Sequence, residues 1–195
     1  MKMVKLICVL ILIIAVSLHA QVFNTSQTLK SGKWSLGLNP ALHDHGDNEF
    51  GLFIHGGYGI SRGMDLGLKL GFGYNETYFG ADLEWVIRGI SPYISISAGG
   101  HSYGDVGLDA TMNFTFPINK QVHLYTGFDF DLIFIDRDDN PNTPDDEGGN
   151  DTVFPVWLFV GTEVGIRHNM TLLLEVELEI NDAYSIFGGG INFYF

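Results

Sequence analysis

Apolar residues occupy every second position along most of the chain, from about residue 33 to the C-terminus. In the segment at 64–74, for example, Leu66 and Leu68 are separated by Gly67 and followed by Lys69. Successive side chains of a β-strand point to opposite faces, so a period of two predicts strands rather than helices. The predicted strands are 32–42, 49–60, 64–74, 77–88, 91–101, 105–117, 121–135, 152–167, 169–180 and 184–195. The sequence therefore predicts an all-β chain of ten strands.

The strand count depends on one weak boundary. The fifth and sixth segments join through Ser102–Gly104, which is a poor turn signal compared with the others. An eight-stranded arrangement is therefore the main alternative. Either even number returns the C-terminus to the side of the sheet on which the first strand begins.

The second face of the strands mixes glycine with charged residues. Glycine weakens strands, so a soluble sandwich would seldom place so much of it on a water-facing surface. In a narrow closed barrel the same face points inward, where small residues relieve crowding and charges must pair or be wetted. The pattern thus predicts a transmembrane antiparallel up-and-down β-barrel with an apolar outer face. The predicted lumen network is Lys69, Asp82, Glu84, Arg88, Asp109, Asp129, Asp131, Glu163, Glu175, Glu177 and Glu179.

The connections between the predicted strands alternate in character. Four are tight and lie beside Arg62, Arg88, Lys120 and Arg167, and the other five include the long acidic stretch at 136–151. Short turns on the periplasmic side and longer loops outside are typical of outer-membrane barrels. We therefore expect the cationic turns on the periplasmic side, near negatively charged lipid headgroups.

The first twenty residues have the layout of a signal peptide. Lys2 and Lys5 precede an apolar run at 6–18, and Ala20 offers a cleavage site before Gln21. The apolar run is shorter than the roughly 20 residues that a membrane-spanning helix needs. We expect residues 1–20 to be removed on export, residues 21–31 to form a short polar lead, and residues 32–195 to form the barrel.

Charge and cysteine content narrow the function further. Cleavage would remove Cys8, the only cysteine, so no disulfide or thiol chemistry is expected in the mature chain. It would also remove two of the 10 basic residues, leaving 8 against 23 acidic residues and a formal charge of −15. Nucleic-acid binding requires a basic face, so we expect no nucleic-acid partner.

The C-terminal segment resembles the closing strand of bacterial outer-membrane β-barrels. Ile191, Phe193 and Phe195 share one face, and the chain ends on that aromatic residue. Together with the alternation and the turn asymmetry, this likeness extends over residues 32–195 to the small barrels of the OmpA-membrane-domain and OmpX type. The resemblance implies an outer-membrane location after export. It also implies outer-membrane lipid or lipopolysaccharide and the barrel assembly machinery as partners, with the three residues as the assembly signal.

The loop at 136–151 is the most acidic part of the chain. Asp136, Asp138, Asn140, Asn142 and Glu147 occupy positions 1, 3, 5, 7 and 12 of an EF-hand count, and such oxygen ligands suit Ca²⁺. Pro141, however, stands where an EF-hand needs glycine, and no helices flank the loop. A looser Ca²⁺ or Mg²⁺ site is one reading, and a solvated acidic loop without a cofactor is the simpler one.

Two other groups of residues could carry chemistry. His43, Asp44, His45 and Asp47 offer nitrogen and oxygen donors for Zn²⁺, although an unsupported loop binds metal weakly. His101-Ser102 could be interpreted as part of a hydrolytic triad, but no second feature supports it. We therefore expect no catalytic residues and no resident cofactor.

The lumen leaves three functions open. A network of paired charges would fill a narrow barrel and leave a structural or surface-interaction protein. Rings of carboxylates would instead favour a narrow cation-preferring channel. A soluble lipocalin-like binder of a small ligand is the third alternative, and it would require the apolar face to point inward.

Overall fold

The computed structural model describes residues 25–44, 48–73, 77–136, 150–181 and 185–195. Its elements are β1 (Trp34–Asp44), β2 (Asn48–Ser61), β3 (Met64–Phe72), β4 (Tyr78–Arg88), β5 (Tyr93–Tyr103), β6 (Asp105–Pro117), β7 (Val122–Asp136), β8 (Asn150–Val153), β9 (Val156–Arg167), β10 (Met170–Asn181) and β11 (Ile186–Tyr194). The predicted signal peptide falls outside the described residues.

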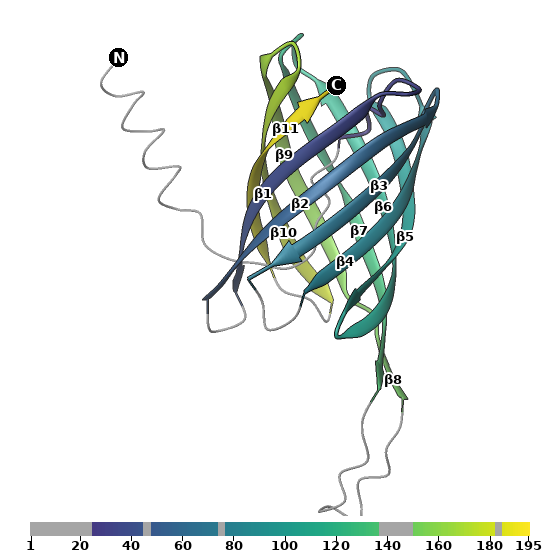
Figure 1. Cartoon of the computed structure of the whole chain (residues 1–195), viewed down its shortest axis with the longest axis vertical. Helices are drawn as coiled ribbons and strands as arrows, with labels where there is room; N and C mark the ends of the chain where they lie inside the picture. Colours follow the sequence, from purple (N-terminus) through teal and green to yellow (C-terminus); the bar gives the residue numbers. More distant parts are fainter. Residues whose placement is uncertain (1–24, 45–47, 74–76, 137–149, 182–184) are drawn as a thin grey trace, which may run out of the picture.

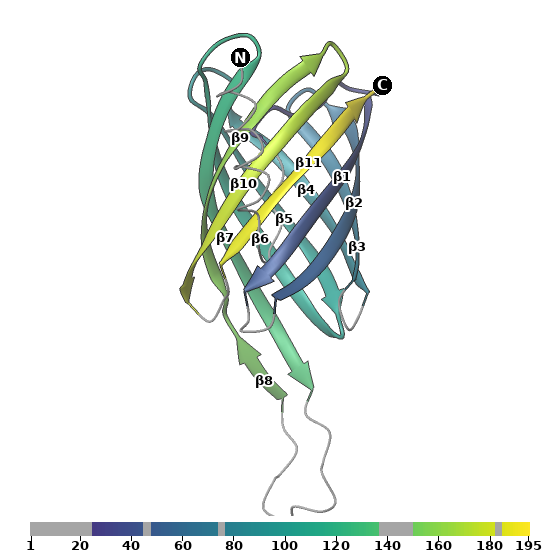
Figure 2. The same ribbon diagram turned by 90° about the vertical axis from the view of Figure 1, so that its left-hand side faces the viewer.

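The strands form one closed antiparallel barrel. Consecutive strands pair with each other, except that β8 and β9 both pair with β7, and β1 pairs with β11 to close the ring. The last residue completes this seam, because the Phe195 N–H donates to the Trp34 carbonyl at 2.9 Å. Figures 1 and 2 show the tilted strands from two sides, with the C-terminus and the start of β1 at the same end. We call this the terminal end and the other the loop end.

The barrel has ten strands, because β8 and β9 are two parts of one. Phe130 pairs with Val156 of β9 and Ile133 pairs with Val153 of β8, which is the same register along β7. The interruption falls at Pro155, which has no N–H to donate to a neighbouring strand. The Pro155 carbonyl still accepts a hydrogen bond from the Asp131 N–H at 3.0 Å. The ten-strand prediction is thus confirmed.

The weak boundary between the fifth and sixth predicted strands is a true turn. Tyr103 of β5 pairs with Asp105 of β6, so Gly104 alone connects the strands. Gly104 has a φ of 71°, a left-handed conformation that glycine adopts without steric cost. The eight-strand alternative fails here because one glycine suffices for a turn that usually takes two or more residues.

Large apolar side chains cover the outside of the barrel. Leu68 is 48% exposed and Leu174 is 42% exposed, and they alternate with interior residues of the same strands. This orientation is opposite to the one that a soluble lipocalin-like barrel requires. Among the described residues, no helix is both long and apolar enough to cross a membrane.

The two ends of the barrel differ. At the terminal end, short turns at Arg62–Gly63, 89–92, 118–121 and 168–169 join the strands. At the loop end, the paired strands β7 and β8 continue past the rim of the barrel, as both views show.

Candidate functional site in the barrel interior

The interior of the barrel contains a small apolar cluster. Ala41, Phe53, Tyr125, Phe159 and Leu173 are each at most 4% exposed and pack together, with Tyr78 against them. The Tyr78 ring meets the Phe53 ring edge-on, with centroids 5.5 Å apart. These side chains come from β1, β2, β4, β7, β9 and β10, so they reach inward from most of the circumference.

Interior glycines make room for these rings. A Cβ on Gly71 would collide with the Phe53 ring, one on Gly161 with the Tyr125 ring, and one on Gly127 with both Phe159 and the Met112 carbonyl. Each glycine lies on a strand adjacent to the ring it accommodates. Glycine is needed on this face because rings on one strand lie over the backbone of the next.

Charged side chains fill the rest of the interior. The Lys69 Nζ lies 3.2 Å from an Asp82 carboxylate oxygen, with side-chain exposures of 15% and 5%. The Thr111 hydroxyl donates to Asp129 at 2.6 Å. Because both carboxylates are largely removed from water, these contacts replace hydration that the side chains lose on folding.

His101 connects two further carboxylates toward the loop end. Its Nδ1 lies 3.4 Å from Asp109 and its Nε2 lies 3.8 Å from Asp131. The Tyr78 ring stacks on the imidazole with centroids 5.5 Å apart and an interplanar angle of 17°. The polar network therefore continues directly from the apolar cluster through Tyr78.

A second polar network lies at the terminal end. The Glu163 carboxylate is 3.1 Å from His123 Nδ1 and accepts a hydrogen bond from the Tyr194 hydroxyl at 3.2 Å. The same Nδ1 is 2.8 Å from the Gln27 amide nitrogen. One Nδ1 can accept from this amide or donate to the carboxylate, but it cannot do both. Whether the His123 Nδ1 carries a hydrogen therefore decides which of the two it bonds.

Residues 25–31, which we name the strap, cross the terminal mouth of the barrel. The Ser26 N–H donates to the Thr115 hydroxyl oxygen at 2.9 Å, and the Ser26 hydroxyl donates to the Asn113 carbonyl at 2.9 Å. On the other side, the Leu29 N–H donates to Asp65, and the Ser31 hydroxyl donates to the Ile60 carbonyl at 3.1 Å. These contacts run from β2 and β3 to β6, nearly across the ring.

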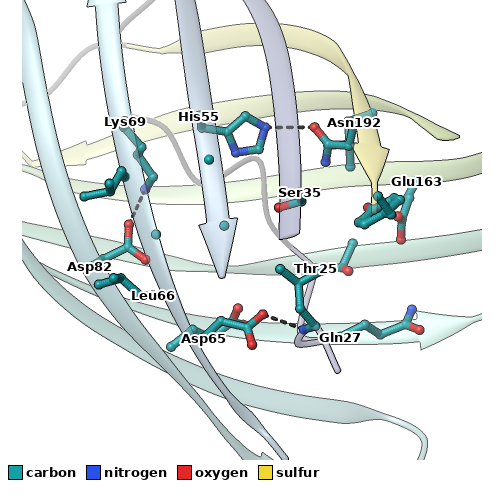
Figure 3. A pocket seen from close by; sticks show the side chains of 18 residues that line it. Thr25, Gln27, Ser35, His55, Asp65, Leu66, Lys69, Asp82, Glu163 and Asn192 are labelled. Carbon is teal, nitrogen blue, oxygen red and sulfur yellow. Dashed lines mark hydrogen bonds and ion pairs between the residues drawn. The ribbon is translucent and has the colours of Figure 1, made fainter. Parts of the chain in front are cut away.

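A cavity of about 50 Å³ remains beneath the strap. A buried water needs roughly 10–15 Å³ by this measure, so the space suits a few waters rather than a sugar or a peptide. Figure 3 shows Thr25 and Gln27 beside it, with Lys69 directed at Asp82 and His55 at Asn192. His55 Nε2 and Asn192 Oδ1 are 2.8 Å apart.

Most residues of the predicted lumen network lie in the interior. Asp82, Glu84, Asp129, Asp131, Glu163, Glu175 and Glu177 are at most 9% exposed, and Lys69 and Asp109 lie among them. Arg88 and Glu179 do not fit the prediction, because both are exposed at strand ends. Glu179 keeps the inward register, since it pairs with the buried Trp157, but it lies near the loop-end rim of β10. In β4 the pairing register shifts between Val86 and Arg88. Simple alternation fails beyond such a shift.

The structure does not bring the candidate metal-binding or catalytic groups together in its described part. The Ca²⁺ hypothesis at Asp136, Asp138, Asn140, Asn142 and Glu147 and the Zn²⁺ hypothesis at 43–47 rest on side chains outside the described residues. In the part of the chain that is described, no group of three His, Cys, Asp or Glu side chains is arranged to hold a metal ion. His101 faces the interior, whereas Ser102 pairs with the outward-facing Phe79 and Val106, so the two cannot form one triad.

Sequence reasoning missed the strap. Residues 21–31 were expected to be a short polar lead, with no prediction of any contact to the barrel, and Ser26 is only 1% exposed. Nothing in a short polar segment indicates that it will fold back into a lumen. The paired ring and glycine positions were visible only as a glycine-rich face, because their matching depends on the register between strands.

Comparisons with known proteins identify the fold of this chain but no family. No family model and no curated protein matches the chain. Among solved structures, the NanC porin aligns with 8% identity and a TM-score of 0.52, covering 81% of this chain and 98% of that one. The KdgM porin aligns with 9% identity and a TM-score of 0.46, covering 82% of this chain and 98% of that one. The outer membrane protein OprG from Pseudomonas aeruginosa aligns with 9% identity and a TM-score of 0.43, covering 88% of this chain and 99% of that one. With the closed ten-stranded ring and its apolar exterior, the likeness to NanC shows that this chain has the fold of the small outer-membrane β-barrel proteins.

Proposed function

We propose that this protein is an integral protein of the bacterial outer membrane whose barrel is a closed, non-catalytic scaffold with a structural or surface-interaction role. The apolar exterior and the shared fold support the membrane location. The observation that carries the closed scaffold is the filled interior. Apolar side chains from six strands, four of them aromatic, meet in one cluster, and the strap crosses the terminal mouth.

Barrel size agrees with a closed interior. Barrels of about eight strands have interiors that side chains just fill, and those of 16 or more leave an aqueous channel. Ten strands lie near the closed limit. The interior of this barrel also holds the rings of Phe53, Tyr125 and Phe159, which occupy the space at the level of the apolar cluster.

The partners follow from this location. Outer-membrane lipid or lipopolysaccharide would surround the wall, and the assembly machinery would read Ile191, Phe193 and Phe195. Phe195 is 63% exposed and Ile191 is 37% exposed, so both are accessible from outside the barrel. The loop at 136–151 would then be the main surface contact, with Ca²⁺ as an optional ligand.

A narrow cation-preferring channel is the second candidate. Among the described interior side chains, Lys69 is the one Lys or Arg, and it lies among at least seven buried carboxylates. Rings of carboxylates favour cations over anions. If the apolar cluster or the strap moved aside, this interior would select for cations.

Planar-bilayer conductance of the refolded protein tests the proposal, after a heat-shift gel shows folding. We expect the wild type to be silent and the double variant Phe53→Ala/Phe159→Ala to give cation-selective steps. Phe128→Ala, which trims an outward ring that is 38% exposed, is the matched control and should stay silent. Discrete cation-selective steps in the wild type would overturn the closed scaffold and favour the channel.

A further inference from the structure

The basic residues of this chain gather at one end of the barrel. Six of the ten Lys and Arg residues are exposed at the terminal end, and we name them the basic rim: Lys30, Lys33, Arg62, Arg88, Lys120 and Arg167. Of the other four, Lys69 lies inside the barrel, and Lys2, Lys5 and Arg137 lie outside the described residues. The basic rim is therefore a property of one end and not of the whole surface.

The basic rim is spread around the circumference. Each of the four turns at the terminal end carries or adjoins one of its cations, and the two lysines lie just before β1. The ion pairs found among the described residues do not include them. Arg88 makes a hydrogen bond to the Ser91 carbonyl at 3.5 Å, a neutral partner that leaves its charge uncompensated.

Acidic side chains are absent from the exposed surface at this end of the described chain. The exposed acids among the described side chains, Asp151 and Glu179, belong to strand segments at the loop end. Asp65, Glu84 and Glu163 lie near the terminal mouth but point into the barrel, where they line the cavity. A molecule outside the barrel would thus meet a surface of positive charge there.

Each part of the basic rim adjoins an exposed apolar side chain. Trp34 follows Lys33, Ile87 precedes Arg88 and Ile166 precedes Arg167, and these three are 58%, 62% and 48% exposed. Ile60 and Ile118 stand two residues before Arg62 and Lys120 and are 43% and 60% exposed. A soluble polyanion could bind the cations but would make no favourable contact with these exposed apolar side chains. A lipid has both an anionic headgroup and an acyl chain, which match the cation and the isoleucine.

We propose that the basic rim binds the anionic headgroups of membrane lipids in the leaflet at the terminal end. The inference rests on the proposed membrane location. The cations contact headgroup phosphates while Trp34 and the neighbouring isoleucines contact the first part of the acyl chains. Anionic lipid then enriches around this end of the barrel and fixes its orientation in the membrane.

The tryptophans provide a built-in probe. Trp34 and Trp85 lie on the outer face near the terminal end, and Trp85 is opposite Met64, two residues from Arg62. Trp157 is 4% exposed inside the barrel and should not respond to lipid. Quenching of Trp fluorescence by brominated lipids therefore reports on lipid around the basic rim.

The experiment compares the refolded protein in vesicles of phosphatidylcholine mixed with phosphatidylglycerol, with either lipid brominated. We expect phosphatidylglycerol to be enriched about threefold or more over its bulk fraction at low salt and to approach parity at high salt. The variant Arg62→Gln/Arg88→Gln/Lys120→Gln/Arg167→Gln should approach parity at low salt. The loop-end control Asp151→Asn/Glu179→Gln should keep the wild-type enrichment.

The outcomes separate this inference from the proposed function. Strong quenching by brominated phosphatidylcholine with no preference for phosphatidylglycerol would keep the membrane location and overturn the lipid site. An absence of quenching by either lipid would overturn both. If the fourfold variant does not fold, the salt dependence of the wild-type enrichment decides, because an enrichment unaffected by salt would contradict recognition by charge.

Discussion

The outer and inner faces of the same strands obey different rules. Outside, residues such as Leu68 and Leu70 point away from the barrel without a specific partner, and we expect only their polarity to matter. Inside, each large side chain has a specific counterpart, as Phe53 has Gly71 and Lys69 has Asp82. The exterior is therefore specified by the polarity of its residues, and the interior by the fit between specific pairs of residues.

This difference matters for how the barrel is stabilised. Apolar side chains that are surrounded by lipid gain nothing from contacting each other instead, because lipid tails are equally apolar. The outer face therefore places the barrel in a membrane but does little to determine its shape. The interior has both a packed cluster and paired charges, which only one arrangement of the ten strands can satisfy. Mutations on the two faces should therefore differ in kind as well as in size.

The largest effect is expected at Lys69. Lys69→Met leaves the Asp82 carboxylate without its cation in the interior, and removing one partner of a buried pair typically costs about 3–5 kcal/mol. Leu68→Met, the same new residue one position away on the outer face, should change stability by less than about 1.5 kcal/mol. Urea unfolding of the refolded proteins in detergent micelles measures both.

A double variant sharpens this first test. Lys69→Met/Asp82→Asn removes both charges and should recover part of the stability that Lys69→Met loses. Equal losses for Leu68→Met and Lys69→Met would mean that the two faces do not differ in their demand for specific partners.

The outer face could be predicted because alternation alone defines it. The strand limits agree with the structure to within about two residues at most ends, and Leu68 and Leu174 point outward as expected. Most interior carboxylates followed from the same alternation. Arg88 and Glu179 did not: a register shift precedes Arg88, and Glu179 lies so near the end of β10 that its side chain is exposed. A local pattern contains neither the shift nor the height of a residue in the barrel wall.

The pairing of interior residues could not be predicted for a related reason. Whether Gly161 faces Tyr125 depends on the stagger between β7 and β9, which adds up around the whole ring. The strap is a stronger case, since Ser26 and Thr115 are 89 residues apart. A polar segment carries no local sign of such a distant partner.

The second prediction introduces charge on the outside. Leu68→Arg and Leu174→Arg each place a cation on the lipid-facing wall, which costs about 2–4 kcal/mol near the bilayer midplane. We expect both variants to insert poorly, as measured by the heat-shifted band on a gel after folding into vesicles. Glu177→Gln, an interior change that keeps the shape of the side chain, should insert far better. Normal insertion of both arginine variants would mean that the outward face was assigned the wrong way.

The smallest expected effects come from a single methyl group added to either face. A Cβ on Gly127 would collide with the Met112 carbonyl and the Phe159 ring, so Gly127→Ala should destabilise the barrel by about 1–3 kcal/mol. Outward-facing Gly56 has open space, with the nearest atom, the Ser35 carbonyl oxygen, 3.9 Å away. Gly56→Ala should therefore be neutral or stabilise by about 0.4–1 kcal/mol, because alanine restricts the unfolded chain. Urea midpoints of the two variants give the sign of each change, and a loss at Gly56 as large as at Gly127 would show that the added methyl acts through the strand backbone rather than through interior matching.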